Sequence, residues 1–205
     1  MIPTPSYDYA RIAQNLFSGE GRADNHHVAK GFLAGAIGGL VATGVKSIAE
    51  KIFPPRDPDE DAPPATLANR AAQALAGERL DERQKAIAEQ GMHWLFGTLI
   101  GGVYGAACEL VPDLKQGYGL AFGATVYGVM HQGVLPAADL EEPLPEQEPD
   151  EARNEMITHL AYGFVTEVVR DMVRERLDEE TYATDTPTVY TPAAAPRPAA
   201  VAYAQ

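Results

Sequence analysis

The stretch GFLAGAIGGLVATGV, residues Gly31–Val45, contains no Asp, Glu, Lys or Arg and holds five glycines. Three further stretches lack charge in the same way: Gly91–Cys108, Gln116–Ala138 and Met156–Thr166. Each is longer than an ordinary β-strand and mostly apolar, which predicts four apolar helices. A bilayer core requires roughly 20 apolar residues. The third stretch meets that length outright, the first and second meet it with their flanking residues, and the fourth requires Glu167 and Arg170 to pair inside the membrane.

Glycine content separates a membrane bundle from a soluble bundle with unusually apolar core helices. A glycine in a water-exposed helix interior costs about 0.8–1 kcal/mol relative to alanine. In lipid, small residues four positions apart allow two helix backbones to approach closely. This spacing occurs in the pairs Gly31/Gly35, Gly35/Gly39, Gly97/Gly101, Gly101/Gly105 and Gly119/Gly123. The pattern therefore favours membrane helices and predicts that these eight glycines are helix-packing positions.

These patterns predict an all-α fold, a four-helix transmembrane bundle with glycine-rich helix packing in residues 30–177. The four spans are placed at about 30–52, 91–111, 116–135 and 155–177, and two short amphipathic helices in the first connection at about 66–76 and 81–90. The short turn Pro112–Lys115 makes the second and third spans an antiparallel hairpin. Residues 1–29 form a polar N-terminal segment, and the Pro/Ala-rich residues 178–205 form a tail that is either disordered or bound by a partner.

Charge is segregated along the chain. The whole sequence has 16 Lys and Arg against 29 Asp and Glu, a net charge of -13, which argues against nucleic acid as a partner. The mean hydropathy of -0.20 describes the connections more than the helices. Residues 137–155 alone hold eight carboxylates and one arginine. When the long first connection is left out, Lys and Arg concentrate on the side of both termini, and the positive-inside rule then predicts cytoplasmic termini.

Ionisable side chains within apolar helices are costly at membrane depth and are candidates for function. Three of the helices carry one histidine each, at His93, His131 and His159. At about 100° per residue, Glu155, His159 and Arg170 share one face of the last helix. We predict one intramembrane polar cluster, made of Lys46, Glu50, His93, Tyr104, Glu109, His131, Glu155, His159, Glu167 and Arg170.

Three interpretations of this cluster stay open: structural pairing between helices, a proton or ion relay, and a metal site. Histidine titrates near neutral pH, which suits a relay. The spacing from Glu155 to His159 is not the Glu-x-x-His of di-iron bundles, and no His-x-x-x-His occurs, so neither a metal nor another cofactor is predicted. The chain also lacks Gly-x-Ser-x-Gly, a P-loop and His-Glu-x-x-His, so it is not expected to be an enzyme.

An ordered set of residues carries a resemblance to a known family. The set comprises Val45-Lys46, Ala49-Glu50, Pro54-Pro55-Arg56, His93, Tyr104, Glu109, Pro112, Gln116-Gly117, Val129-Met130-His131, Pro136, Glu155, His159-Leu160, Glu167 and Arg170. With these residues the chain resembles the YagU family of small bacterial inner-membrane proteins, a domain of unknown function. The resemblance covers most of residues 30–177 and implies a multi-pass protein of the bacterial inner membrane without enzyme activity. The first connection and the tail depart from it.

Three functions are therefore weighed. The first is a structural or accessory subunit in membrane lipid, which packs against other membrane proteins or its own copies through the glycine faces. The second is a proton- or pH-responsive membrane protein that uses the His/Glu/Arg cluster. The third is a soluble metal-binding helix bundle whose ligands are His and Glu.

Overall fold

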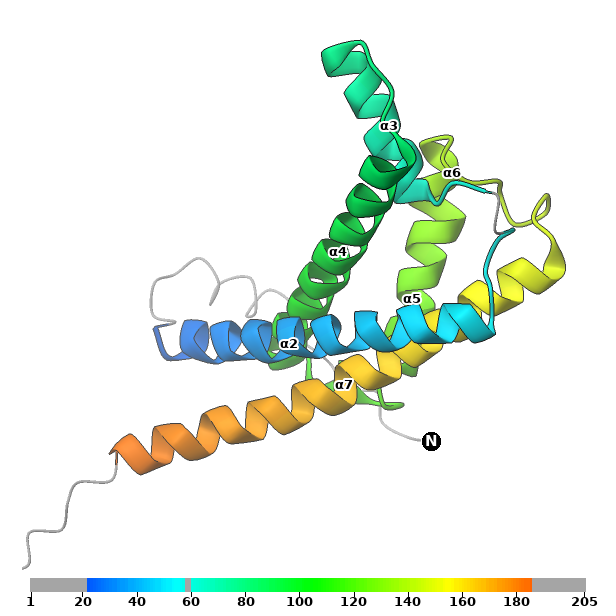
Figure 1. Ribbon diagram of the computed structural model, residues 1–205. Coiled ribbons are helices and arrows are strands. Elements are labelled where there is room, and N and C mark those ends of the chain that lie inside the picture. Colours follow the sequence, from blue (N-terminus) through cyan, green and yellow to red (C-terminus); the bar gives the residue numbers. More distant parts are fainter. Residues whose placement is uncertain (1–21, 58–59, 186–205) are drawn as a thin grey trace, which may run out of the picture.

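The computed structural model describes residues 22–57 and 60–185, and within those ranges the chain forms helices and no strand (Figure 1). The elements are α2 (Arg22–Ile52), α3 (Pro63–Ala76), α4 (Glu82–Leu110), η1 (Pro112–Lys115), α5 (Leu120–Val129), η2 (Met130–Val134), α6 (Leu135–Ala137) and α7 (Pro149–Asp185). The predicted all-α class is therefore confirmed for this part of the chain.

Helices α2 and α7 form the centre of the molecule. They lie antiparallel, α4 crosses α2, and α5 packs against α7 at a steep angle (Figure 1). Helix α3 packs against α4. The C-terminal end of α2, the N-terminal half of α4, the end of α5 and the N-terminal end of α7 therefore meet on one side of the molecule. That side is also where the acidic connection between α6 and α7 lies.

The contact between α2 and α4 is made by backbone against backbone. Gly31, Gly35 and Gly39 of α2 face Gly105, Gly101 and Gly97 of α4 in antiparallel order. A Cβ added at Gly101 would lie 2.5 Å from the carbonyl oxygen of Gly35, and one added at Gly35 would lie 2.8 Å from the Cα of Gly105. No larger residue fits without separating the helices, which is the packing that small residues four apart permit.

The contact between α5 and α7 uses the same device. A Cβ added at Gly163 of α7 would lie 2.6 Å from the backbone nitrogen of Gly123, and Gly119 faces the carbonyl of Gly163. Gly38 brings α2 against α7, because a Cβ added there would lie 2.5 Å from the carbonyl oxygen of Thr166 on α7. This contact joins the α2–α4 pair to the α5–α7 pair. All eight glycines named from the sequence thus lie at helix contacts, and Gly38 and Gly163 join them.

Among the described residues, the interior contains small and polar side chains and three tyrosines, whereas many large aliphatic and phenylalanine side chains are exposed. The largest fully buried side chains are Arg170, Thr43, Thr158, Thr166 and Cys108. The threonines satisfy their hydroxyl groups within their own helices; Thr43, for example, donates to the carbonyl of Gly39 at 2.7 Å. Exposed apolar residues include Phe32, Leu40, Val41, Leu99, Val103, Phe164 and Met172. Buried polar side chains of this size are the exception in water-soluble domains.

Several predicted boundaries are wrong. The expected helix at 81–90 and the span at 91–111 are one helix, α4, because Asp81 caps its N-terminus with Gln84 and Gly91 does not interrupt it. The third span is shorter than 116–135: α5 begins only at Leu120, after three residues of positive φ, and the π-helical turn η2 follows it. The polar segments at 22–29 and 178–185 extend α2 and α7, whereas residues 1–21 and 186–205 lie outside the described ranges.

One helix among those described, Asn25–Ile52 within α2, is long and apolar enough to cross a membrane by length and composition. The predicted third span is divided among α5, η2 and α6. A bundle of four spans therefore stays a prediction, while a single span candidate is established.

Candidate functional site

The ten predicted polar residues do not form one cluster. The structure places Lys46, Glu50, His93, His131, Glu155 and His159 at one end of the α2–α7 pair, here called the loop-side group. Tyr104, Glu109, Glu167 and Arg170 lie at the opposite end, here called the terminus-side group. Glu155 and Arg170, one from each group, are 15 residues apart on α7, which corresponds to about 22 Å along a helix. The prediction of a single cluster is therefore corrected to two.

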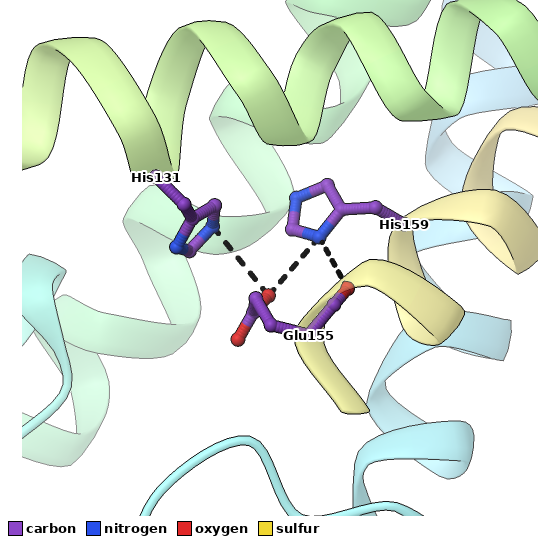
Figure 2. A group of neighbouring side chains, drawn as sticks. All are labelled: His131, Glu155 and His159. Carbon is purple, nitrogen blue, oxygen red and sulfur yellow. Dashed lines mark hydrogen bonds and ion pairs between the residues drawn. The ribbon is translucent and has the colours of Figure 1, made fainter. Parts of the chain in front are cut away.

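Glu155 is the centre of the loop-side group. It is 3% exposed, and its Oε1 accepts a hydrogen bond from Lys46 Nζ at 2.8 Å. His159 Nδ1 and His131 Nε2 lie 3.1 Å and 3.5 Å from the same oxygen, so both imidazoles point at this carboxylate (Figure 2). Lys46 also pairs with Glu50, one turn later in α2. A buried carboxylate is stable only when cations and donors surround it in this way.

His131 connects Glu155 to the acidic connection. Its Nδ1 lies 2.8 Å from Glu141 Oε2, while its Nε2 faces Glu155. The ring also stacks on Tyr127, with ring centres 5.6 Å apart. His131 lies in the π-helical turn η2, and single π-helical turns of this kind are frequent at functional sites.

His159 is oriented by its own helix. Its Nδ1 lies 2.9 Å from the carbonyl oxygen of Glu155, one turn earlier in α7. Its ring centre is 4.8 Å from that of His131, with the two rings nearly perpendicular. The two imidazoles and the Glu155 carboxylate therefore form one buried unit from two different helices.

Two hollows meet at this unit. The larger, here called the inner cavity, has a volume of about 460 Å³ and lies among α2, α3, α4, α5 and α7. Its walls are mostly apolar, with Phe96, Ile100 and Val126 among them, and the loop-side group forms its polar part. The second, here called the acidic vestibule, has a volume of about 270 Å³ and is lined by Arg56 and by Glu60, Glu141, Glu142, Glu151 and Glu155 among other residues. Glu155 lines both.

Glu151, in the acidic vestibule, lies outside the predicted spans. Burial, followed by repulsion from Glu60 and Asp57, raises the pKa of its carboxyl above the ordinary value. The vestibule therefore holds a carboxyl group that retains its proton at a higher pH than a free glutamate does.

The terminus-side group consists of tightly paired charges. Arg170 is fully buried and donates to both carboxylate oxygens of Glu167, at 2.6 and 2.7 Å. Arg174 Nε donates to Glu109 at 2.8 Å and so joins α7 to α4. Tyr104 donates its hydroxyl to the carbonyl of Leu114 at 3.2 Å, which attaches the turn after α4. These pairs fix how α4 and α7 lie against each other, and Arg174 was absent from the predicted set.

Comparison with known proteins places the chain in a family. The family model described as "Protein of unknown function (DUF1440)" matches residues 40–168, more than half of the chain. The chain belongs to the DUF1440 family. No curated protein and no solved structure matches it. The expected membership of a family of unknown function is thereby confirmed, while the name YagU stays an expectation. The matched segment of this DUF1440 protein contains the whole loop-side group, together with Arg56 and Glu141.

Two residues that contact the loop-side group of this DUF1440 protein were not predicted from the sequence. Glu141 contacts His131, and Arg56 NH2 lies 3.6 Å from Glu155 Oε2. Both residues lie in connections outside the apolar stretches, where an acid or an arginine is ordinary. The available signal was indirect: the density of acids in residues 137–155 and the Pro54-Pro55-Arg56 string.

The unit of two histidines and a glutamate in this DUF1440 chain has the residue types of a metal centre. One candidate ligand atom from each of His131, Glu155 and His159 lies within 4.8 Å of the others. However, the ammonium of Lys46 already donates to the Glu155 oxygen that faces both imidazoles, and Arg56 adds a second cation beside it. A divalent ion would have to enter next to two positive charges. The arrangement suits one added positive charge, such as a proton, better than the two of a divalent ion.

Proposed function

We propose that this DUF1440 protein is a multi-pass membrane protein that responds to pH by binding a proton at His131, between Glu141 and Glu155. The proposal has two parts, a membrane setting and a proton site, and each has its own support.

Support for the membrane setting comes from the inverted distribution of polarity. The largest fully buried side chains are Arg170, three threonines and Cys108, while Phe32, Leu40 and Val103 are exposed. Water-soluble domains rarely leave a continuous apolar surface uncovered. In a bilayer, the same surface contacts lipid, and buried polar groups face the bundle interior. We extend the single span candidate to four spans on this ground.

Support for the proton site comes from one observation: both ring nitrogens of His131 face carboxylates. A neutral imidazole has one N–H donor, so it can donate to Glu141 or to Glu155 but not to both. The imidazolium has two donors and satisfies both carboxylates. Protonation of His131 therefore strengthens the contacts that hold the acidic connection against α7.

The charges that face His131 leave room for one more positive charge. From the elements packed around it, the titratable and charged groups are Lys46 and Glu50 of α2, Arg56, His93 of α4, Tyr127 of α5, Glu141, and Glu155 and His159 of α7. With the histidines neutral, three carboxylates face two cations. One proton balances this set.

A route from solvent exists along the same residues. The side chain of Glu141 is 21% exposed at the vestibule, while His131 and Glu155 behind it are buried. A proton from solution would reach Glu141 first and His131 next. Glu151, with its raised pKa, lines the vestibule through which it would pass.

The accessory-subunit role stays a prediction. Its motive was the glycine faces of three helices, and in the structure α2 and α4 use them on each other, as do α5 and α7. Glycine faces covered within the chain give less reason to expect a partner there. Localisation in the inner membrane, with cytoplasmic termini, belongs to the proposal too, and the cations of the terminus-side group agree with it.

The proton site is tested by the pH dependence of the single tryptophan, Trp94, which follows His93 in α4. The protein is reconstituted in nanodiscs, and Trp94 fluorescence and thermal stability are followed from roughly pH 5 to 8, where histidine changes charge. We expect a transition in the unmodified protein that His131→Gln and Glu141→Gln remove. His26→Gln, at the other end of α2, is the control and should leave the transition in place. An unchanged transition in His131→Gln would refute the proposal.

A further inference from the structure

The inner cavity is built like a ligand site. Its volume of about 460 Å³ falls within the range of roughly 300–1,000 Å³ that small-molecule sites occupy. Apolar side chains such as Phe96, Ile100 and Val126 form most of its wall, and polar groups gather around Glu155. An apolar wall with a few convergent polar groups selects an amphipathic molecule over a fully polar one.

Two buried polar atoms on this wall have no hydrogen-bond partner among the described residues. They are Glu155 Oε2 and His93 Nε2, and both residues line the inner cavity. Arg56 approaches Oε2 only to 3.6 Å, beyond hydrogen-bond range. A buried carboxylate oxygen without a donor is costly, and what it lacks is an N–H or O–H group.

The charge around the two hollows favours a cation. The inner cavity is lined by Glu50, Glu89 and Glu155 against Lys46 and Arg56. The acidic vestibule is lined by five glutamates against one arginine. Clefts lined by one sign of charge concentrate ions of the opposite sign. A cationic molecule is therefore drawn to the vestibule, and an anionic one is repelled from it.

We infer that the inner cavity binds a small amphipathic amine. Its ammonium group donates to Glu155 Oε2, and its apolar part lies against Phe96, Ile100 and Val126. The inference shares Glu155 with the proposed function and rests on it for the connection of that carboxylate to the vestibule. It adds a ligand class that the pH response alone does not require.

Three nearly isosteric probes test the inference: 2-phenylethylamine, 2-phenylethanol and 3-phenylpropanoate. Binding to the full chain in nanodiscs is measured by calorimetry at pH 8, with empty nanodiscs subtracted. We expect saturable binding of the amine, binding of the alcohol weaker by at least about tenfold because it lacks the charge, and no binding of the carboxylate. Tighter binding of the carboxylate than of the amine would overturn the inference, as would no amine binding at millimolar concentration.

Variants locate the binding. Glu155→Gln should weaken amine binding by at least about tenfold, since a charge-assisted bond is lost. Because that variant also loses the partner of Lys46, a second variant, Ile100→Trp, fills the cavity and leaves Glu155 in place. Leu95→Trp adds the same bulk on the exposed surface of α4 and is its control. Amine binding that survives Ile100→Trp would contradict the assignment.

The two proposals fail separately. Amine binding without a pH transition would remove the proton site and keep the ligand site. A pH transition without amine binding would do the reverse.

Discussion

Glu155 illustrates how individual residues set the energetics of this protein. It is almost fully buried and makes ionic contacts with Lys46, Arg56 and two histidines from four different segments. A buried ion pair adds little net stability compared with an apolar pair, but removing one partner leaves an uncompensated charge. Residues of this kind are therefore sensitive to substitution without being the source of the fold's stability.

Glu155→Ala is expected to destabilise the protein by up to about 3–5 kcal/mol, because Lys46 would lose its buried carboxylate and keep only the more exposed Glu50. Arg153→Ala, two residues earlier in α7, removes an exposed ion pair to Asp150 and should change stability by less than about 1 kcal/mol. Unfolding of both variants in mixed micelles provides the comparison. Equal stabilities of the two variants would show that loss of the Glu155 carboxylate leaves no costly unpaired charge in the loop-side group.

Asp178, at the terminus side, gives stability a dependence on acid pH. The hydrogen bond from Arg174 lowers the pKa of Asp178, partial burial opposes this, and Lys30 adds to the lowering. Since the folded-state pKa is below the unfolded one, the stabilisation is fully present above the ordinary pKa and is lost as pH falls through the folded value. Its side chain is 43% exposed, so Asp178→Asn should cost less than about 1 kcal/mol at neutral pH. This deficit should shrink below about pH 4 in acid-unfolding curves; a deficit independent of pH would exclude the ionic explanation.

At the scale of helices, close approach of backbones decides which elements pair. Local spacing of glycines predicted the face of α2 that meets α4, because glycines four apart lie on one side of a helix. Gly38 and Gly163 were missed because neither has another glycine four positions away in the sequence. The π-turn at His131 was missed for a similar reason: nothing in Met130–Val134 marks a turn of that kind.

Gly101→Ala tests the α2–α4 contact. The added methyl group would meet the backbone of Gly35 and Gly39, which cannot yield without separating the helices. Overpacking of this kind costs typically about 1–3 kcal/mol. Gly91→Ala, in the same helix, meets nothing within 4 Å and should be neutral or stabilise by up to about 1 kcal/mol. Thermal unfolding in nanodiscs separates the two, and similar effects of both substitutions would contradict backbone contact at Gly101.

At the scale of the whole molecule, acidic and basic side chains concentrate at opposite ends. Acids concentrate in the connection before α7, at the loop side, while Arg170, Arg174 and Lys30 lie at the terminus side. The sequence predicted this polarity from charge segregation. It did not predict that the polar residues form two groups, because residues on one helix face were expected to lie together, although Glu155 and Arg170 are 15 residues, or about 22 Å, apart along α7.

This polarity yields a prediction of topology. If both termini are cytoplasmic, the acidic connection faces the periplasm and Arg176, which is exposed on α7, faces the cytoplasm. The only native cysteine, Cys108, is buried, so it gives little background for cysteine labelling. Glu142→Cys and Arg176→Cys place single reporters on the two sides, with Cys108→Ala as a further control.

Intact spheroplasts of a bacterial expression host are treated with a membrane-impermeant maleimide, and the same cells are treated after lysis. We expect Glu142→Cys to be labelled in both cases and Arg176→Cys only after lysis, because the bilayer separates the two ends of α7. Labelling of Arg176→Cys alone in spheroplasts would invert the topology and keep the spans. Recovery of the protein in the soluble fraction would contradict the membrane setting itself, and the exposed apolar faces of α2 and α4 would then require a protein partner in place of lipid.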